Sequence, residues 1–275
     1  VLLLHWLPWV EEEELAHDVE AGRLESRHCP EASAGPQALD MLRHFGRFIV
    51  TSSFSRDELI RRGIGTDRIC IAPPGSDDTS MRPLQSKGES ACNRDGAGTP
   101  FRFASLAHWV PVKGLHRLPS VFADLPGSGW EWHSVGKFDR GGSYGAALYE
   151  AFSRPGLQER CVLHGERQPE DAWRLIGTCG CLLVPSVFET YGMAAAEAAA
   201  LGVPVIAINC GGLGEAVRAG QDGILCNTPE EFREAVLEAV RNSAFLPVPE
   251  TDLDKRREMK WETTALQIQA FLDDT

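Results

Sequence analysis

The sequence lacks the features that mark a membrane or secreted protein. No apolar run reaches the roughly 18–20 residues of a membrane-spanning helix. No Asn-X-Ser/Thr sequon occurs, and VLLLHWLPWV at the start has neither the basic n-region nor the small-residue cleavage site of a signal peptide. We therefore expect a cytoplasmic protein. Because the chain begins at Val1, inside an apolar run and without Met, we also expect further sequence upstream.

Positive charge is scarce in this chain. Its 275 residues include 27 Lys and Arg against 39 Asp and Glu, which gives a net charge of −12 and an isoelectric point near 5.2. Proteins that neutralise nucleic-acid phosphates are usually basic. The balance argues against a nucleic-acid partner. It also does not favour attachment to a membrane surface, although a peripheral position at the membrane stays open.

The eight cysteines form neither a disulfide scaffold nor a zinc pattern. The chain is too long for a small disulfide-rich domain, and most of its cysteines sit in apolar, strand-like runs. Such residues pack as small hydrophobic groups, so we expect buried free thiols. Cys179 and Cys181 have no second pair at zinc spacing, so we expect no metal site there.

The dinucleotide fingerprint G-x-G-x-x-G is also missing. The segments GGSYG (141–145) and GGLG (211–214) both depart from its spacing. This absence argues against a nicotinamide-dependent dehydrogenase.

Short apolar runs alternate with helical segments along the whole chain. Strands alternating with helices of about 10–15 residues indicate parallel βαβ units, and strands that are apolar throughout indicate a sheet covered on both faces. The predicted strands are 1–4, 48–52, 69–72, 101–106, 131–135, 162–164, 182–185, 203–208 and 223–226. The predicted helices are 56–62, 115–124, 144–153, 169–177, 193–201 and 230–242.

Two polar stretches divide the chain. Residues 81–100 are rich in Gly, Pro and Ser, as linkers are, and residues 247–254 precede an amphipathic helix at 255–273. We therefore expect a first domain with its linker at 1–95, a second domain at 96–250 and a closing helix at 251–275. The second has the strands of a full doubly wound domain, whereas the first has about three. The first is expected to be incomplete.

The segment VPSVFETYGMAAAEAAALGVPVIAINCGGLGEAV (184–217) carries the strongest chemical pattern. A buried strand ends, a loop carries Glu189, and a helix then begins. A helix N-terminus beyond the carboxyl end of a parallel strand binds anions and suits a diphosphate. Gly192 would let the backbone approach such a ligand closely. Glu197 would be placed to accept hydrogen bonds from sugar hydroxyls, as acidic residues do for ribose in dinucleotide folds.

This order of residues resembles glycosyltransferase family 4, the group 1 glycosyl transferases. The likeness rests on Glu189 and Glu197, with seven residues between them, on Phe188 before them and on 202–204 and 211–212 after. Four more segments share the likeness. Residues 50–77 resemble the end of that family's first domain, and 110–114 resemble its Lys-Gly loop. Residues 164–186 resemble the elements before the double-Glu motif, and 258–272 resemble its closing helix. The resemblance implies an α/β fold of GT-B type, with two Rossmann-like doubly wound domains.

The resemblance also implies roles for the motif residues. Lys113 would contact the donor diphosphate and stabilise the negative charge that develops on the leaving phosphate. Glu197 would hold the nucleotide ribose, and Glu189 would contact the transferred sugar as a catalytic residue. Gly192 and Met193 would offer backbone N–H groups to phosphate or sugar.

Three other residues complete the implied site. Arg167 would lie near the base. His5, at the end of the apolar run LLLH, would act near the reacting sugar; the alternative is a histidine that packs beside neighbouring tryptophans. The family usually has Gly-Arg where this chain has Ala107 and His108. His108 would take the place of the phosphate-binding arginine, although it is mostly neutral at pH 7.

The resemblance implies a retaining glycosyltransferase without metal or other cofactor. Its donor would be a nucleotide sugar such as a UDP- or GDP-sugar, and its acceptor an unknown sugar, lipid or small molecule. Two alternatives stay open. One is a truncated or non-catalytic nucleotide-sugar-binding protein, which the short first domain suggests. The other is an epimerase or phosphorylase of the same architecture.

Overall fold

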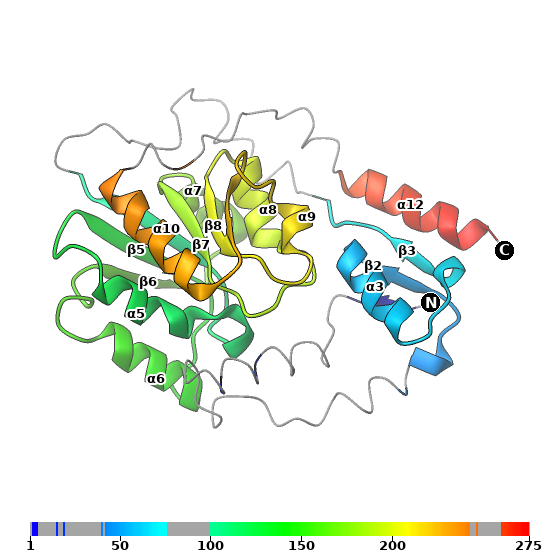
Figure 1. The fold of residues 1–275 in the computed structure, drawn as a ribbon, viewed down its shortest axis with the longest axis horizontal. Coiled ribbons are helices and arrows are strands. Elements are labelled where there is room, and N and C mark those ends of the chain that lie inside the picture. Colours follow the sequence, from blue (N-terminus) through cyan, green and yellow to red (C-terminus); the bar gives the residue numbers. More distant parts are fainter. Residues whose placement is uncertain are drawn as a thin grey trace.

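A computed structural model describes residues 2–4, 15, 19, 40, 42–75, 99–242, 246 and 260–274. Within these residues the chain forms two parallel sheets, one of three strands and one of six (Figure 1). The smaller sheet has the order β1-β2-β3, with β1 (Leu2–Leu4), β2 (Phe48–Val50) and β3 (Ile69–Ile71). Helix α3 (Ser53–Arg61) follows β2 and packs on this sheet.

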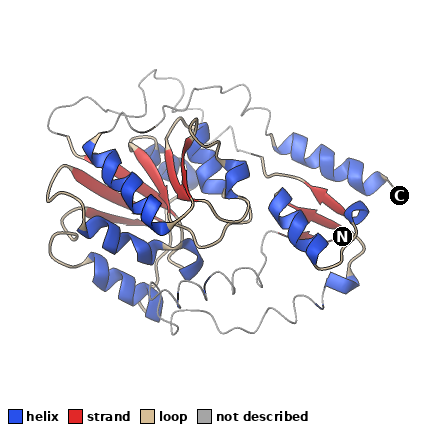
Figure 2. Cartoon of the chain, viewed as in Figure 1, coloured by secondary structure: helices blue, strands red, loops and turns tan. Residues whose placement is uncertain are grey.

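The larger sheet has the order β6-β5-β4-β7-β8-β9, with every pair parallel. Figure 2 shows its strands between helices on both sides. Its strands are β4 (Phe101–Leu106), β5 (Trp130–Val135), β6 (Cys161–Gly165), β7 (Cys181–Val184), β8 (Val205–Ile208) and β9 (Gly223–Cys226). Its helices are α5 (Leu118–Ala123), α6 (Ser143–Phe152), α7 (Pro169–Ile176), α8 (Met193–Ala200), α9 (Leu213–Ala216) and α10 (Pro229–Arg241).

Side chains of the six-stranded sheet alternate between two apolar cores. In β7, Leu183 packs with α5, α6 and α10, whereas Leu182 packs with α7, α8 and α9. In β8, Ile206 and Val205 divide in the same way. The strands are apolar throughout because helices cover both faces of the sheet. The predicted α/β class with parallel strands is confirmed.

The last helix of the chain returns to the first sheet. Helix α12 (Trp261–Asp273) lies beside β3 in Figure 1, and Thr264 Oγ1 donates a hydrogen bond of 2.7 Å to the carbonyl of Pro73. Arg47 donates to the carbonyls of Phe271 and Asp274 and lies 4.8 Å from the centre of the Phe271 ring. The helix was expected to begin at residue 255. It begins at Trp261, and residues 255–259 lie outside the described residues.

The segment after β4 differs from its prediction. We expected one helix over 115–124, but two 3-10 turns, η4 (Pro111–Lys113) and η5 (Leu115–Arg117), precede the short α5. Gly114 between them has a left-handed backbone with φ 64°, and Pro119 in the first turn of α5 has no N–H to donate to a preceding turn. Gly114 therefore separates the two turns, and Pro119 keeps α5 from extending back through residue 115.

The described cysteines are free thiols, as predicted: Cys70, Cys161, Cys179, Cys181, Cys210 and Cys226. The expected burial holds for three of these six, and the other three are partly exposed. In the part of the chain that the structure describes, no helix is long and apolar enough to cross a membrane.

Candidate active site

A cavity of about 450 Å³ lies at the carboxyl ends of β4 and β7. Parallel α/β sheets bind their ligands at this edge. Residues from elsewhere complete its wall: Thr51 and Pro74 from the three-stranded side, and Trp261 from the start of α12. The cavity is therefore bounded by both sheets and the last helix. We call it the sheet-end cavity.

Lys113 and Glu189 form an ion pair on the wall of this cavity. Lys113 Nζ lies 2.7 Å from Glu189 Oε1, and Ser186 Oγ donates a 2.8 Å hydrogen bond to the same oxygen. The Glu189 side chain is 14% exposed. Two donors hold this carboxylate in one orientation, so the cavity contains a fixed anion beside a partly exposed cation.

Gly114 allows the Lys113 loop to approach the loop after β7. Its φ is 64°, and a Cβ there would stand 1.9 Å from the carbonyl oxygen of Pro185. Any side chain would force the two loops apart. The glycine after Lys113 therefore fixes the distance between Lys113 and Glu189.

The N-terminus of α8 opens onto the same cavity. Its first cap residue, Gly192, has φ 97° and no side-chain cap, and a Cβ there would lie 2.2 Å from Leu213 Cδ1. Met193 and Ala194 line the cavity. The first N–H groups of a helix have no acceptor within it, and the helix dipole makes this end positive. The arrangement suits an anion such as a phosphate.

The Gly211–Gly212 loop supports Glu189 from behind. The N–H of Gly212 donates a 2.8 Å hydrogen bond to the Glu189 carbonyl. A Cβ on Gly211 would lie 2.1 Å from that oxygen, and one on Gly212 would lie 2.1 Å from the Thr190 carbonyl and 2.7 Å from Ser52 Oγ. The two glycines permit three backbone segments to meet here.

The structure brings five of the predicted site residues to one cavity: His108, Lys113, Glu189, Gly192 and Met193. His108 is exposed, and its Nδ1 accepts a 3.0 Å hydrogen bond from the Lys137 N–H. In the neutral ring Nε2 then carries the proton and can donate to a ligand.

The other three predicted residues are not brought together there. Glu197 is partly buried in α8 and does not line the cavity, and Arg167 is exposed after β6. His5 lies outside the described residues. No group of three or more His, Cys, Asp or Glu side chains within the described ranges could hold a metal ion.

Several residues of the cavity had no predicted role. Thr51 is 3% exposed, and its Oγ1 has no hydrogen-bond partner among the described residues. Tyr191 is buried; burial and the charge of Glu215 raise its pKa to about 12, so its hydroxyl stays protonated at neutral pH. Thr51 and Trp261 belong to elements distant in sequence from the motif, and nothing local to them predicted their place.

Comparison with known families decides the assignment. Residues 94–260 match the sequence model of the family described as glycosyl transferases group 1. The chain belongs to the group 1 glycosyl transferases. This confirms the family that the double-Glu motif predicted.

Among curated group 1 relatives, a D-inositol 3-phosphate glycosyltransferase of Rhodococcus opacus (strain B4) is 30% identical over 229 residues. The match covers 80% of this chain and 51% of that protein. A protein of the same name from Nocardia farcinica (strain IFM 10152) is 33% identical over 168 residues, which are 59% of this chain and 37% of the relative. The chain thus spans about half the length, or less, of the curated relatives it matches.

Solved structures share the fold at lower identity. HepE from Anabaena, in complex with UDP and glucose, has a TM-score of 0.72 at 20% identity, over 99% of this chain and 71% of that one. Sucrose-phosphate synthase from Thermosynechococcus elongatus has a TM-score of 0.73 at 21% identity, over 98% and 66%. These likenesses confirm the predicted α/β architecture of GT-B type.

Proposed function

We propose that the protein is a retaining glycosyltransferase that takes a sugar from a nucleotide-diphosphate sugar bound in the sheet-end cavity. One observation carries the proposal: a lysine, a fixed carboxylate and an uncapped helix N-terminus converge on the same 450 Å³ space. Membership of the group 1 family and the UDP and UDP-glucose named in the solved HepE complexes support a UDP-sugar as donor.

The cation and the helix end would act on the leaving group. When the bond from sugar to phosphate breaks, negative charge grows on the diphosphate. Lys113 and the first N–H groups of α8 would stabilise that charge; their positions on the wall of the cavity support this role. His108 would add a hydrogen bond at the same end.

Glu189 would orient the sugar. Its carboxylate is already held by Lys113 and Ser186. A hydroxyl of the transferred sugar can therefore donate a hydrogen bond to this carboxylate without any rearrangement of the site. Glu197, farther along α8, is proposed to accept hydrogen bonds from the ribose, and Arg167 to lie near the base. We assign no protein nucleophile.

The acceptor would enter from the side of the three-stranded sheet. The Thr51 hydroxyl, which has no hydrogen-bond partner among the described residues, is buried on that wall and would bond to a substrate hydroxyl or phosphate. The relatives named for D-inositol 3-phosphate make a phosphorylated polyol the first acceptor to assay. Sugars and lipid acceptors follow it.

The donor assignment is tested by ligand binding. UDP, GDP and ADP are added to the chain, and the one that binds the native state raises the melting temperature. Lys113→Gln is expected to weaken diphosphate binding about tenfold, which corresponds to about 1.4 kcal/mol. Arg174→Gln is the matched control, because it also removes a cation that is paired with a carboxylate, here Asp171, but at an exposed position. Equal affinity in the Lys113 and Arg174 variants would contradict the diphosphate contact.

The catalytic assignment is tested by turnover with a radiolabelled UDP-sugar and the acceptors above. Glu189→Gln is expected to lower turnover about 100-fold while UDP affinity changes little, because the interaction forms with the sugar and not with the nucleotide. Glu234→Gln, an exposed carboxylate on α10, is the control. Equal losses of turnover and UDP affinity would contradict the role. Nucleotide binding without turnover would favour the non-catalytic alternative, and loss of turnover in EDTA would overturn metal independence.

A further inference from the structure

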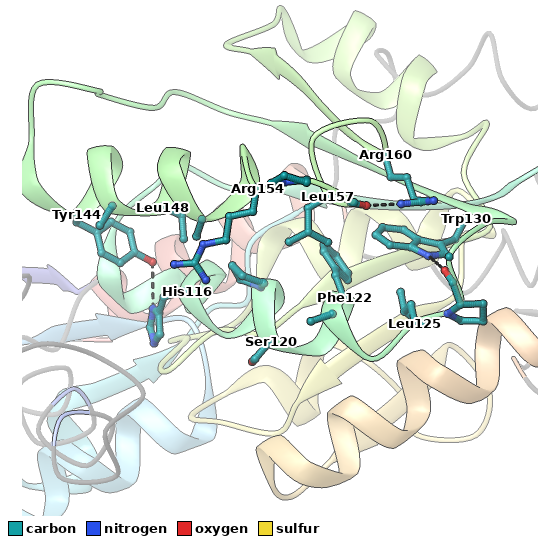
Figure 3. A pocket seen from close by; sticks show the side chains of 18 residues that line it. His116, Ser120, Phe122, Leu125, Trp130, Tyr144, Leu148, Arg154, Leu157 and Arg160 are labelled. Carbon is teal, nitrogen blue, oxygen red and sulfur yellow. Dashed lines mark hydrogen bonds between the residues drawn. The ribbon is translucent and has the colours of Figure 1, made fainter.

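A second and larger cavity lies between α5 and α6 (Figure 3). Its volume is about 610 Å³, within the range of about 300–1,000 Å³ that is typical of small-molecule sites. None of its lining residues lines the sheet-end cavity. We call it the outer cavity. The proposed transfer reaction gives it no role.

One end of the outer cavity is apolar and rigid. Phe122, Leu125 and Leu157 line it, and all three are buried. The Phe122 ring packs against Trp130 with their centres 5.1 Å apart, and the indole N–H of Trp130 donates a 2.7 Å hydrogen bond to the carbonyl of Pro126. These contacts fix the walls in place, so an apolar ligand would not need to open them.

The other end of the outer cavity is polar. His116 Nδ1 lies 3.0 Å from Tyr144 Oη, and Figure 3 shows the Arg154 side chain reaching over the cavity toward this pair. The backbone carbonyl of Arg154 accepts from the N–H groups of Leu157 and Gln158, but its guanidinium makes no hydrogen bond or ion pair within the described part of the chain. Arg160, by contrast, lies over the Trp130 ring and donates to the carbonyl of Gly156. The cavity therefore has one guanidinium that is already engaged and one that is available.

We propose that the outer cavity binds a single-chain anionic amphiphile, with its carboxylate or phosphate on Arg154 and its alkyl chain along the wall at Phe122 and Leu157. The separation of a free cation at one end from apolar side chains at the other matches the two parts of such a ligand. The protein has a net charge of −12, so its overall field repels anions and only a local cation can attract one. A cavity of about 610 Å³ has room for a single molecule of such an amphiphile with one alkyl chain.

The two cavities adjoin through consecutive residues. Leu115 lines the sheet-end cavity, and His116 lines the outer one; both belong to η5, which follows Lys113 and Gly114. A ligand that contacts His116 therefore lies one residue from a wall of the proposed donor site. The binding of the amphiphile itself does not depend on the proposed transferase activity.

The proposal is tested by calorimetric titration of the full chain with octanoate, decanoate and dodecanoate, each below its micellar concentration. One saturable site is expected. The affinity should rise about fourfold for each added methylene, which is about 0.8 kcal/mol of apolar burial. Decyltrimethylammonium, with the same chain and the opposite charge, should bind at least about tenfold more weakly than decanoate.

Two pairs of variants locate the site. Arg154→Gln should weaken dodecanoate binding about three- to tenfold, and Arg174→Gln, at an exposed position on α7, should not. Ala151→Phe fills the cavity from α6 and should abolish binding, whereas Ala146→Phe, on the exposed side of the same helix, should not.

Four results would overturn the proposal. They are no saturable binding of dodecanoate, equal binding by the Ala151 and Ala146 variants, displacement of dodecanoate by saturating UDP in simple competition, and binding only to vesicles of anionic phospholipid. A circular dichroism spectrum and a melting curve of each variant show that it is folded. None of these readouts requires turnover, so failure of the transferase proposal would be seen separately.

Discussion

Gly114 is the single residue on which the geometry of the sheet-end cavity most depends. Its left-handed backbone and its missing Cβ set the separation between the Lys113 loop and the loop after β7. The pair that we assign to donor binding therefore depends on a neighbour that touches no substrate.

Gly114→Ala is expected to lower stability and diphosphate affinity together. The added Cβ would stand 1.9 Å from the Pro185 oxygen in a strained backbone, at a cost of about 1–3 kcal/mol. For a chain of this size that lowers the melting temperature by roughly 2–12 °C. Gly129→Ala is the control, since Gly129 has φ 88° but nothing within 4 Å of its Cβ position. Equal melting temperatures in the two variants would contradict the steric argument.

The sequence predicted much of the cavity at the level of single residues. Lys113, Glu189 and Gly192 follow the ends of parallel strands or open the next helix, and such positions meet at one edge of a sheet. Thr51 and Trp261 were missed because they reach the cavity from segments far away in the chain. Local pattern carries no information about which distant side chains will complete a wall.

The N-terminus of helix α3 is bonded by a residue of α9, a helix that packs on the six-stranded sheet. Its N-cap Ser52 accepts a 3.2 Å hydrogen bond from the Ser55 N–H. Glu215, in α9, accepts from the N–H of Ser53 at 2.9 Å, from its Oγ at 2.8 Å and from the N–H of Phe54 at 3.2 Å. A carboxylate at a helix N-terminus satisfies free N–H groups and opposes the helix dipole. Glu215 thereby ties α3 to the six-stranded side.

A double-mutant cycle between Ser53→Ala and Glu215→Gln should reveal this tie. The carboxylate is exposed, so its loss is expected to cost only about 0.5–1 kcal/mol, or roughly 1–4 °C in melting temperature. The two changes should be non-additive by about 0.5 kcal/mol or more, because they remove a shared hydrogen bond. Urea unfolding of the four proteins measures the coupling, and strict additivity would contradict it.

The bounds of strands and helices were predictable where the apolar pattern of the segment itself defines the element. The strands expected at 101–106 and 223–226 have those bounds. The prediction failed over 115–124, where apolar spacing suggested one helix but a 3-10 turn at 115–117 comes first and Pro119 has no N–H to bond back to that turn. Periodicity reports which face is buried, while the backbone preferences of single residues decide where a helix can begin.

The stability of the whole molecule should fall in mild acid. His133 Nδ1 lies 2.9 Å from His164 Nε2, with the rings stacked on neighbouring strands β5 and β6. Burial lowers the pKa of His133; the hydrogen bond and charge of Glu131 raise it in part, and the charge of Arg102 lowers it further. Burial also lowers the pKa of His164, together with the charges of His133 and Arg167. The folded protein thus resists protonation of two groups that the unfolded chain protonates near pH 6.5.

The sign of the pH effect follows directly. Above about pH 6.5 both histidines are neutral in the folded and the unfolded state and do not change the free energy of unfolding. Below that pH the unfolded chain binds protons that the folded protein excludes. The free energy of unfolding therefore decreases as the pH falls toward the lowered pKa values. Urea midpoints at pH 7.5 and pH 5.5 measure the drop. His133→Gln should reduce it, and His44→Gln, at an exposed position, should not. An unchanged drop in the His133 variant would contradict the assignment.

The return of α12 to β3 also sets the order in which the molecule can be completed during synthesis. Strands β1 to β3 leave the ribosome before the six-stranded sheet, but the helix bonded to Pro73 through Thr264 comes 191 residues after that proline. By then every strand and helix of the six-stranded sheet has already been made. Domains usually fold in the order of their synthesis. Here the later sheet can finish before the earlier one, so β1 to β3 wait without the cover of α12 while the six-stranded sheet is made.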